Sequence, residues 1–127
     1  LSEGRVLAVA PEGTRSKTGS MQRGKPGIAY LAVRTDAPIL PVAIIGTERL
    51  KEWKRLRRPA CQVIIGPPFH LPKADVKPTT DQLQELADLV MMRIGLLLPP
   101  AYRGVYAAEI ASIEAGQSDK LSILLPA

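Results

Sequence analysis

Two residue types are nearly absent from the sequence, and each scarcity excludes a class of site. The 127 residues include a single cysteine, Cys61, so no internal disulfide can form and a reducing compartment is the default. The single histidine, His70, excludes any site that needs two histidines from this chain. No run of about 18 apolar residues is present, so the sequence predicts no transmembrane helix.

Aromatic residues are also scarce, at 4%, whereas basic residues are in excess, with a net charge of +5. This charge favours an anionic partner, which could be nucleic acid, a phosphorylated metabolite or an anionic membrane surface. With so few aromatics and no recognition module, nucleic acid is the weakest of these, and we expect no nucleic-acid partner. The length and the 46% of hydrophobic residues indicate one globular domain with a core.

Apolar runs and helical spacing alternate in the first half of the chain. Residues 6–10 form a continuous apolar run that predicts a strand buried on both faces. Pro26 then suits a helix start, and apolar spacing predicts a helix as far as Thr35. Residues 39–45 and 62–65 predict two further strands. The order strand, helix, strand predicts a βαβ unit, so the strands at 6–10 and 39–45 should be parallel.

The second half contains the clearest helix of the sequence. Thr79 and Gln82 have capping-box spacing, and Pro99 with Pro100 ends the helical pattern. One apolar face follows the helical repeat and predicts a core contact instead of a membrane contact, because the opposite face lacks lysine. This face comprises Leu83, Leu86, Ala87, Val90, Met91, Ile94 and Leu98.

A polar turn follows the first predicted strand, where ligands of parallel sheets bind. Gly13 allows a ligand to approach the backbone closely, and Arg15 offers a planar fork of donors suited to phosphate. Thr14 adds a hydroxyl. Glu12 would repel phosphate, so it is suited to accept a hydrogen bond from a sugar-like hydroxyl or to hold Arg15. Glu12, Gly13, Thr14 and Arg15 therefore predict a binding site for a polyol phosphate.

The run at residues 11–16 resembles the third signature block of the glycerol-phosphate and lysophosphatidic acid acyltransferase superfamily. That block usually begins with phenylalanine, where this chain has Ala10. Four later segments also resemble the superfamily in order and spacing, so the resemblance covers roughly residues 4–106. These segments are 24–29, at the start of the next helix; 38–43, the fourth block, with its continuation Gly46-Thr47; 63–69; and 97–106.

The resemblance implies an α/β fold, with a mixed, largely parallel sheet flanked by helices. Residues 1–106 would be the C-terminal portion of the acyltransferase domain, and residues 107–127 a C-terminal tail. The implied reaction transfers a fatty acyl group from acyl-CoA or acyl carrier protein to the free hydroxyl of a lysophospholipid, 1-acylglycerol 3-phosphate. Glu12, Gly13 and Arg15 would bind the glycerol-phosphate portion of this acceptor. No cofactor or metal ion is implied.

The superfamily's catalytic block, His-x4-Asp, precedes the third block, and this chain lacks it. In the superfamily the histidine acts as general base on the acceptor hydroxyl, and the aspartate orients it. The second block, with its phosphate-binding basic residue, is also absent. We therefore expect the chain to be a C-terminal fragment without catalytic residues, inactive by itself. The parent enzyme would work at the cytoplasmic face of a membrane, peripherally or anchored through the missing N-terminal part.

His70 and Asp75 have the His-x4-Asp spacing, but they follow the fourth block and enclose Pro72, so we interpret the spacing as chance. The basic run at residues 51–58 surrounds Trp53 and leaves two interpretations open. It is either a solvated surface or a patch that contacts anionic lipid headgroups or the phosphates of the acyl donor. We expect Cys61 to be a small buried apolar residue.

One alternative belongs to a different class of protein. The Glu12–Arg15 turn and the basic run would also suit a non-catalytic domain that binds phosphorylated or anionic lipid. Within the superfamily, the acceptor could instead be glycerol 3-phosphate or another lysolipid.

Overall fold

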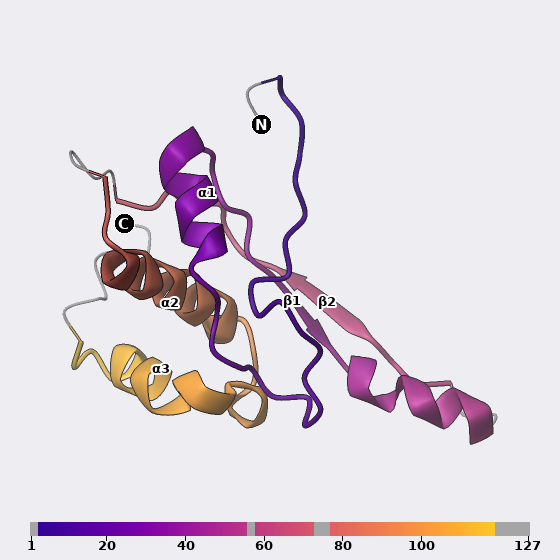
Figure 1. Ribbon diagram of the computed structural model, residues 1–127. Coiled ribbons are helices and arrows are strands. Elements are labelled where there is room, and N and C mark those ends of the chain that lie inside the picture. The colour runs from indigo at the N-terminus through magenta and orange to yellow at the C-terminus, as the bar shows by residue number, and fades with distance from the viewer. Residues whose placement is uncertain (1–2, 56–57, 73–76, 119–127) are drawn as a thin grey trace.

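The computed structural model describes residues 3–55, 58–72 and 77–118. These residues form an α/β structure in which the helices gather on one side of a short, projecting sheet (Figure 1). The elements are α1 (Gly27–Thr35), β1 (Val42–Ile45), the 3-10 helix η1 (Thr47–Arg55), β2 (Gln62–Ile65), α2 (Thr80–Leu96), the 3-10 helices η2 (Pro100–Tyr102) and η3 (Gly104–Tyr106), and α3 (Ala107–Glu114).

Helix α2 begins at the capping box that the sequence predicts. The Thr79 side chain accepts a hydrogen bond from the Gln82 backbone at 3.3 Å, and the Gln82 side chain accepts one from the Thr79 backbone at 2.9 Å. Both bonds satisfy donors that a helix N-terminus leaves unpaired. No helix in the described part of the chain combines the length and the apolar character needed to cross a bilayer.

The predicted apolar face of α2 is buried, because α1 and α3 pack against this helix (Figure 1). Toward α1, Ala87 and Val90 of α2 meet Ala29 and Ala32, and the small alanines let the two helices approach closely. Toward α3, a second cluster surrounds the two methionines of α2, and its buried members are Met21, Ala43, Leu89, Met91, Met92, Leu98, Tyr106, Ile110 and Ile113. The interpretation of the face as core is therefore confirmed.

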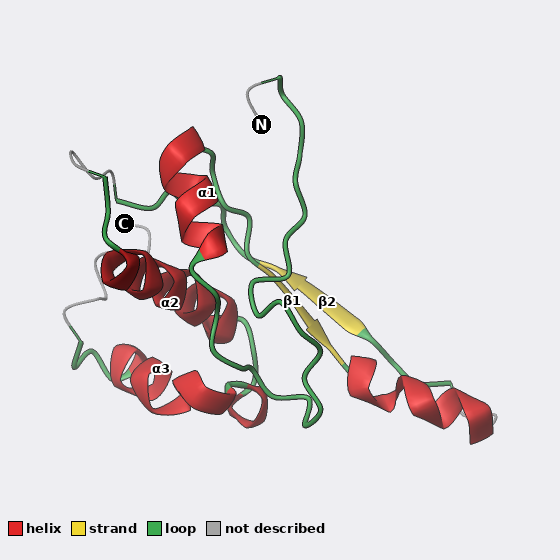
Figure 2. Cartoon of the chain, viewed as in Figure 1, coloured by secondary structure: helices red, strands yellow, loops and turns green. Residues whose placement is uncertain are grey.

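The two strands are antiparallel. Val42 pairs with Ile65 and Ile45 with Gln62, and an isolated bridge between Ile39 and Phe69 continues the pairing (Figure 2). The strands predicted near 39–45 and 62–65 are thus confirmed, with the regular ladder of β1 beginning just after Pro41, which has no N–H to donate.

The strand predicted for residues 6–10 is wrong for this structure. These residues form no strand, and Val6 is 97% exposed. A strand needs a neighbour for its backbone hydrogen bonds, and the described sheet consists of β1 and β2 alone, so residues 6–10 are not paired with it. The parallel βαβ unit is consequently not formed.

One face of this small sheet is apolar and exposed. The register places Val42 opposite Ile65 and Ile44 opposite Val63, and all four side chains are exposed. The other face packs on the helices through Ala43, with Ile45 and Ile64 partly buried. Exposed apolar patches of this kind in soluble proteins mark surfaces that another element or partner covers.

Residues 107–114, for which the sequence predicted no structure, form α3. Ile110 and Ile113 point into the cluster around Met91 and Met92 and are almost completely buried. The boundary between the predicted domain and its tail, at residues 106 and 107, stays a prediction.

Candidate functional site

The turn at residues 10–13 is closed by its own backbone. The Gly13 N–H donates to the Ala10 carbonyl at 3.0 Å, and Gly13 has φ +65°, in the left-handed region that favours glycine. The turn is joined to the start of α1 because the Lys25 N–H donates to the Pro11 carbonyl at 2.8 Å. Residues that lie fourteen positions apart in the sequence are therefore neighbours here.

The Lys25 side chain lies over Gly13. A Cβ at Gly13 would be 3.1 Å from Cδ of Lys25 and 3.2 Å from its Nζ, so the missing side chain leaves room for the lysine. The ammonium group is thereby held beside the backbone that continues into Thr14 and Arg15. Lys25 lies within the segment 24–29 that resembles the superfamily, and the sequence alone indicated no role for it. Its proximity to Gly13 depends on the backbone bond to Pro11, which no sequence pattern reveals.

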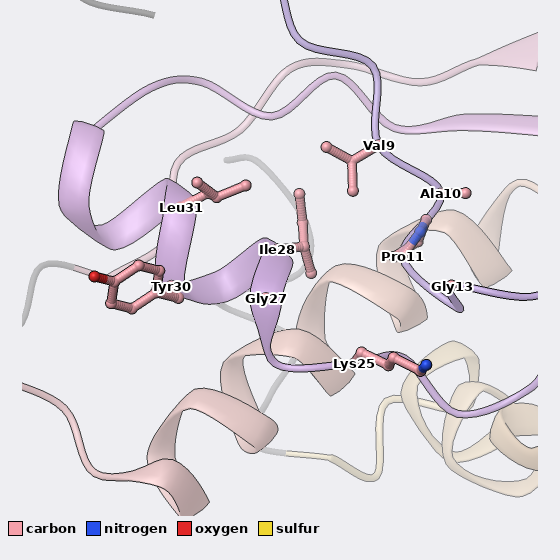
Figure 3. A pocket seen from close by; sticks show the side chains of 9 residues that line it. All are labelled: Val9, Ala10, Pro11, Gly13, Lys25, Gly27, Ile28, Tyr30 and Leu31. Atoms are coloured by element: carbon pink, nitrogen blue, oxygen red, sulfur yellow. The ribbon is translucent and has the colours of Figure 1, made fainter.

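A pocket of about 350 Å³ opens between this turn and α1 (Figure 3). Figure 3 shows Lys25 and Gly13 at one end of the pocket, with Val9 facing Ile28 and Leu31 of α1. One end is therefore cationic and the walls are apolar, an arrangement suited to an amphiphilic anion. The lining consists of Val9, Ala10, Pro11, Gly13, Lys25, Gly27, Ile28, Tyr30 and Leu31.

Of the four predicted site residues, Gly13 lines this pocket, whereas Glu12, Thr14 and Arg15 do not belong to the lining. Thr14 and Arg15 are exposed to solvent next to it. The Arg15 backbone is held, since its carbonyl accepts a hydrogen bond from Gln22 Nε2 at 3.3 Å.

The Glu12 side chain is partly buried at the base of the turn. Burial raises the pKa of the Glu12 carboxyl above its ordinary value of 4.5, and hydrogen bonding to the Gln22 backbone partly offsets this effect. Because burial disfavours the charged form despite this hydrogen bond, the carboxylate is suited to accept a further hydrogen bond from a ligand hydroxyl or from a neighbouring cation.

His70 does not approach this site. Its Nδ1 lies 3.7 Å from Oδ1 of Asp36, the residue that ends α1, whereas Lys25 lies just before the start of that helix. Asp75, the second residue of the chance His-x4-Asp spacing, is outside the described residues. Among the residues that the structure describes, no group of three or more metal-binding side chains is close enough to hold an ion.

The basic run begins within η1, which projects from the end of the sheet farthest from the packed helices (Figure 2). Lys54 and Arg58 are exposed. The side chains of Lys51, Trp53 and Arg55, and all of residues 56 and 57, lie outside what the structure describes. Cys61, expected to be buried, is exposed, because it precedes β2 at the projecting end of the sheet, where the helices do not cover it.

Comparison with known proteins identifies the segment that contains this site. The family model described as Acyltransferase matches residues 1–45, which include the turn, Lys25 and α1. Residues 1–45 are thus similar to the acyltransferase family. Within this acyltransferase segment lie all four predicted site residues and the whole lining of the pocket.

Curated relatives extend the similarity beyond that segment. The chain is 38% identical over 84 residues to 1-acyl-sn-glycerol-3-phosphate acyltransferase alpha of Ovis aries, covering 65% of this chain and 28% of the relative. It is 44% identical over 55 residues to 1-acyl-sn-glycerol-3-phosphate acyltransferase of Cocos nucifera, covering 42% and 18%.

A chloroplastic 1-acyl-sn-glycerol-3-phosphate acyltransferase of Arabidopsis thaliana is 34% identical over 79 residues, covering 60% of this chain and 22% of the relative. The chain thus spans less than a third of the length of each of these relatives. No solved structure matches it significantly.

Proposed function

We propose that this chain binds the phosphate-bearing acceptor in an acyltransferase of phospholipid synthesis. The full-length enzyme transfers a fatty acyl group from acyl-CoA or acyl carrier protein to the free hydroxyl of 1-acylglycerol 3-phosphate. The match of residues 1–45 to the acyltransferase family and the names of the relatives support the reaction class. The observation that carries the site assignment is the Lys25 ammonium held against Gly13, beside the backbone that leads to Arg15.

Each residue of the turn has a distinct part in this proposal. Lys25 and Arg15 supply positive charge and donors for the phosphate, Lys25 as a point charge and Arg15 as a planar fork. Gly13 lets the phosphate approach the backbone, Thr14 donates a hydroxyl, and Glu12 accepts a hydrogen bond from the glycerol portion. The apolar wall formed by Val9, Ile28 and Leu31 would lie along the first carbons of an acyl chain.

The chemical step requires groups that this chain lacks. A general base must remove the proton of the acceptor hydroxyl as the hydroxyl oxygen attacks the thioester carbon, and the C–S bond then breaks so that the donor leaves as its thiol. The chain's one histidine, His70, lies at the other end of α1 from Lys25. We therefore propose that the base is supplied by a His-x4-Asp block outside these 127 residues, and that the chain alone transfers no acyl group. The coding sequence directly upstream of Leu1 should encode this block, and an intact gene that starts near Leu1 would contradict the proposal.

The proposal is tested on the full-length enzyme with Lys25→Met and Arg15→Ala. Loss of one charged hydrogen bond to phosphate should lower kcat/KM for the acceptor roughly 10- to 100-fold, mainly through a higher KM. The KM for the acyl donor should stay unchanged. Lys77→Met removes an exposed lysine before α2 and is the matched control, with no expected effect on either KM. Unchanged acceptor kinetics in both site variants would refute the assignment.

The same assay separates the possible substrates. Glycerol 3-phosphate and other lysolipids, offered in place of 1-acylglycerol 3-phosphate, identify the acceptor by their relative kcat/KM. Acyl-CoA and acyl carrier protein, offered in turn, identify the donor.

We also propose that the full-length domain contains the parallel, helix-flanked sheet that the family resemblance implies. The apolar residues 6–10 would pair alongside β1, and the apolar face of Val42, Ile44, Val63 and Ile65 would be covered. Hydrogen exchange of the full-length protein tests this arrangement. Slow exchange of the amides at 6–10 is expected, and exchange at the rate of an unstructured peptide would rule it out.

A second candidate function is a non-catalytic domain that binds anionic lipid. The exposed cations Lys54 and Arg58 and the half-exposed Leu50 favour contact with an anionic membrane surface at the projecting end of the sheet. Sedimentation with vesicles that contain anionic lipid, compared with neutral vesicles, measures this contact. Binding without any acyl transfer by the full-length protein would favour the second function, whereas transfer activity would exclude it as the sole function.

For the enzyme, we propose that such a contact places it at the cytoplasmic face of a membrane. Fractionation of cells that express the full-length protein, followed by protease treatment of sealed vesicles, tests this location.

A further inference from the structure

Gly24, the residue before Lys25, is hydrogen-bonded through both its N–H and its carbonyl to residues that are distant in the sequence. The Gly24 N–H donates to the hydroxyl oxygen of Tyr106 at 2.9 Å, and the Gly24 carbonyl accepts a hydrogen bond from Gln84 Nε2 at 2.9 Å. Gly24 also packs tightly, since a Cβ there would lie 2.5 Å from Cγ of Met91. Three residues from α2 and η3 thus restrain one glycine of the N-terminal half.

Tyr106 is itself restrained. It is 4% exposed, and its hydroxyl donates to Oδ1 of Asp88 at 2.7 Å while accepting the bond from Gly24. Gln84 Nε2 donates to the same Asp88 oxygen at 3.1 Å, so tyrosine, glutamine and aspartate form one network. Burial raises the pKa of Tyr106 far above its ordinary value, and the bond to Asp88 raises it further, so the hydroxyl keeps its proton throughout the range of an enzyme assay.

On its other side, Lys25 is fixed through its own N–H to the Pro11 carbonyl at 2.8 Å, and Pro26 then begins the hydrogen bonding of α1. The backbone around Lys25 is therefore restrained from 24 to 26, although the side chain is exposed. Restraint of this kind reduces the conformational freedom that a lysine loses when it binds a ligand.

We propose that Tyr106, together with Gln84, is a positioning residue for phosphate binding. It holds the Gly24 peptide so that the Lys25 ammonium stays beside Gly13, where the phosphate of the acceptor binds. This inference rests on the proposed role of Lys25. Tyr106 lies 81 positions after Lys25 in the sequence.

The test is a double-mutant cycle in the full-length enzyme with Tyr106→Phe and Lys25→Met. Tyr106→Phe removes the hydrogen bond from the Gly24 backbone together with the bond to Asp88, and it should raise the KM for the acceptor roughly 2- to 10-fold, with kcat and the donor KM almost unchanged. In the Lys25→Met background, Tyr106→Phe should cause no further increase in the acceptor KM. A merely structural tyrosine would instead show the same effect in both backgrounds.

Gln84→Met is a second variant, which tests the proposal even where Tyr106→Phe fails to fold. It removes the donor to the Gly24 carbonyl and should show the same dependence on Lys25. Ile113→Val is the control, since it weakens the same core cluster and should lower the Tm without changing the acceptor KM.

The outcomes separate this inference from the function on which it rests. If Lys25→Met raises the acceptor KM but Tyr106→Phe and Gln84→Met do not, the positioning role is wrong and phosphate binding stands. If Lys25→Met itself leaves the acceptor KM unchanged, the proposed role of Lys25 fails first. Equal effects of Tyr106→Phe in the presence and absence of Lys25 would also overturn the positioning role.

Discussion

Arg103 and Glu114 form an ion pair through two parallel hydrogen bonds of 2.7 Å, and they join the segment before η3 to the end of α3. The Arg103 side chain is almost buried and also donates to the Leu98 carbonyl at 3.0 Å. The Glu114 side chain remains about half exposed. The pair therefore anchors α3, whose Ile110 and Ile113 complete the core, to the end of α2.

Replacement of Glu114 by glutamine should lower the stability at neutral pH, because it leaves the buried Arg103 guanidinium without its carboxylate. The hydrogen bond to Arg103 lowers the pKa of Glu114 below the ordinary 4.5. A lowered pKa in the folded state means that the stabilisation is complete above about pH 4.5 and is lost as the pH falls further. The Tm of the wild type should therefore fall toward that of Glu114→Gln below this pH, and a constant Tm difference down to pH 3 would contradict the prediction.

Replacement of Gly13 by alanine should destabilise the protein by about 1–2 kcal/mol, because an L-residue is strained at positive φ. The new Cβ would also press on the Lys25 side chain, which is flexible and can move away. Lower affinity for the acceptor should accompany the loss of stability. Urea unfolding measures the first effect, with Gly27→Ala as control, since a Cβ at Gly27 meets no atom within 4 Å. Equal stability of Gly13→Ala and the wild type would argue against this turn geometry.

Replacement of Glu12 by glutamine should raise the Tm at neutral pH. Because burial raises the pKa of Glu12, the folded state favours the protonated carboxyl, and its ionisation lowers stability as the pH rises through the folded pKa. The Tm of Glu12→Gln should therefore exceed that of the wild type at pH 7, and this difference should disappear below pH 4.5. The acceptor KM should increase at the same time, because an amide is a weaker acceptor for a hydroxyl. A lower Tm at pH 7 would show that the carboxylate has a strong partner.

The contact between Gly95 of α2 and Ile110 of α3 gives a prediction with two substitutions. Alanine at Gly95 should gain about 1 kcal/mol of helix propensity. Its Cβ would, however, lie 2.3 Å from Cδ1 of the fully buried Ile110, and such overpacking costs about 1–3 kcal/mol. Gly95→Ala should therefore be destabilising overall.

Ile110→Val removes the clashing methyl group and alone costs about 1 kcal/mol. The double variant should be more stable than Gly95→Ala, although each single substitution destabilises. Chemical denaturation of the four proteins measures this coupling, and simple additivity of the two losses would show that Ile110 rotates away freely.

Features that depend on neighbouring residues were predictable from the sequence. The capping box at Thr79, the end of α1 before Pro38 and the buried stripe of α2 follow from local hydrogen bonds and helical spacing. The strands near Val42 and Gln62 were predicted for the same reason, since short apolar runs favour extended backbone. Their antiparallel pairing was not predicted, because the direction of pairing depends on which partner strand is present.

Residues 6–10 and Cys61 show where local pattern fails. An apolar run indicates a tendency to be buried, but it does not supply the neighbouring strand that burial requires. Residues 6–10 pair with no described strand and are exposed here, and Cys61 is exposed because the sheet projects beyond the helices.

The sequence by itself determined the family resemblance, the turn that carries Glu12–Arg15 and the positions of α1 and α2, because these depend on residue type and short-range spacing. The tertiary structure alone decided that Lys25 lies against Gly13 and that Tyr106 holds Gly24. Both relationships join segments that are distant in the chain, and they arise from backbone hydrogen bonds and packing that exist only once the helices have assembled.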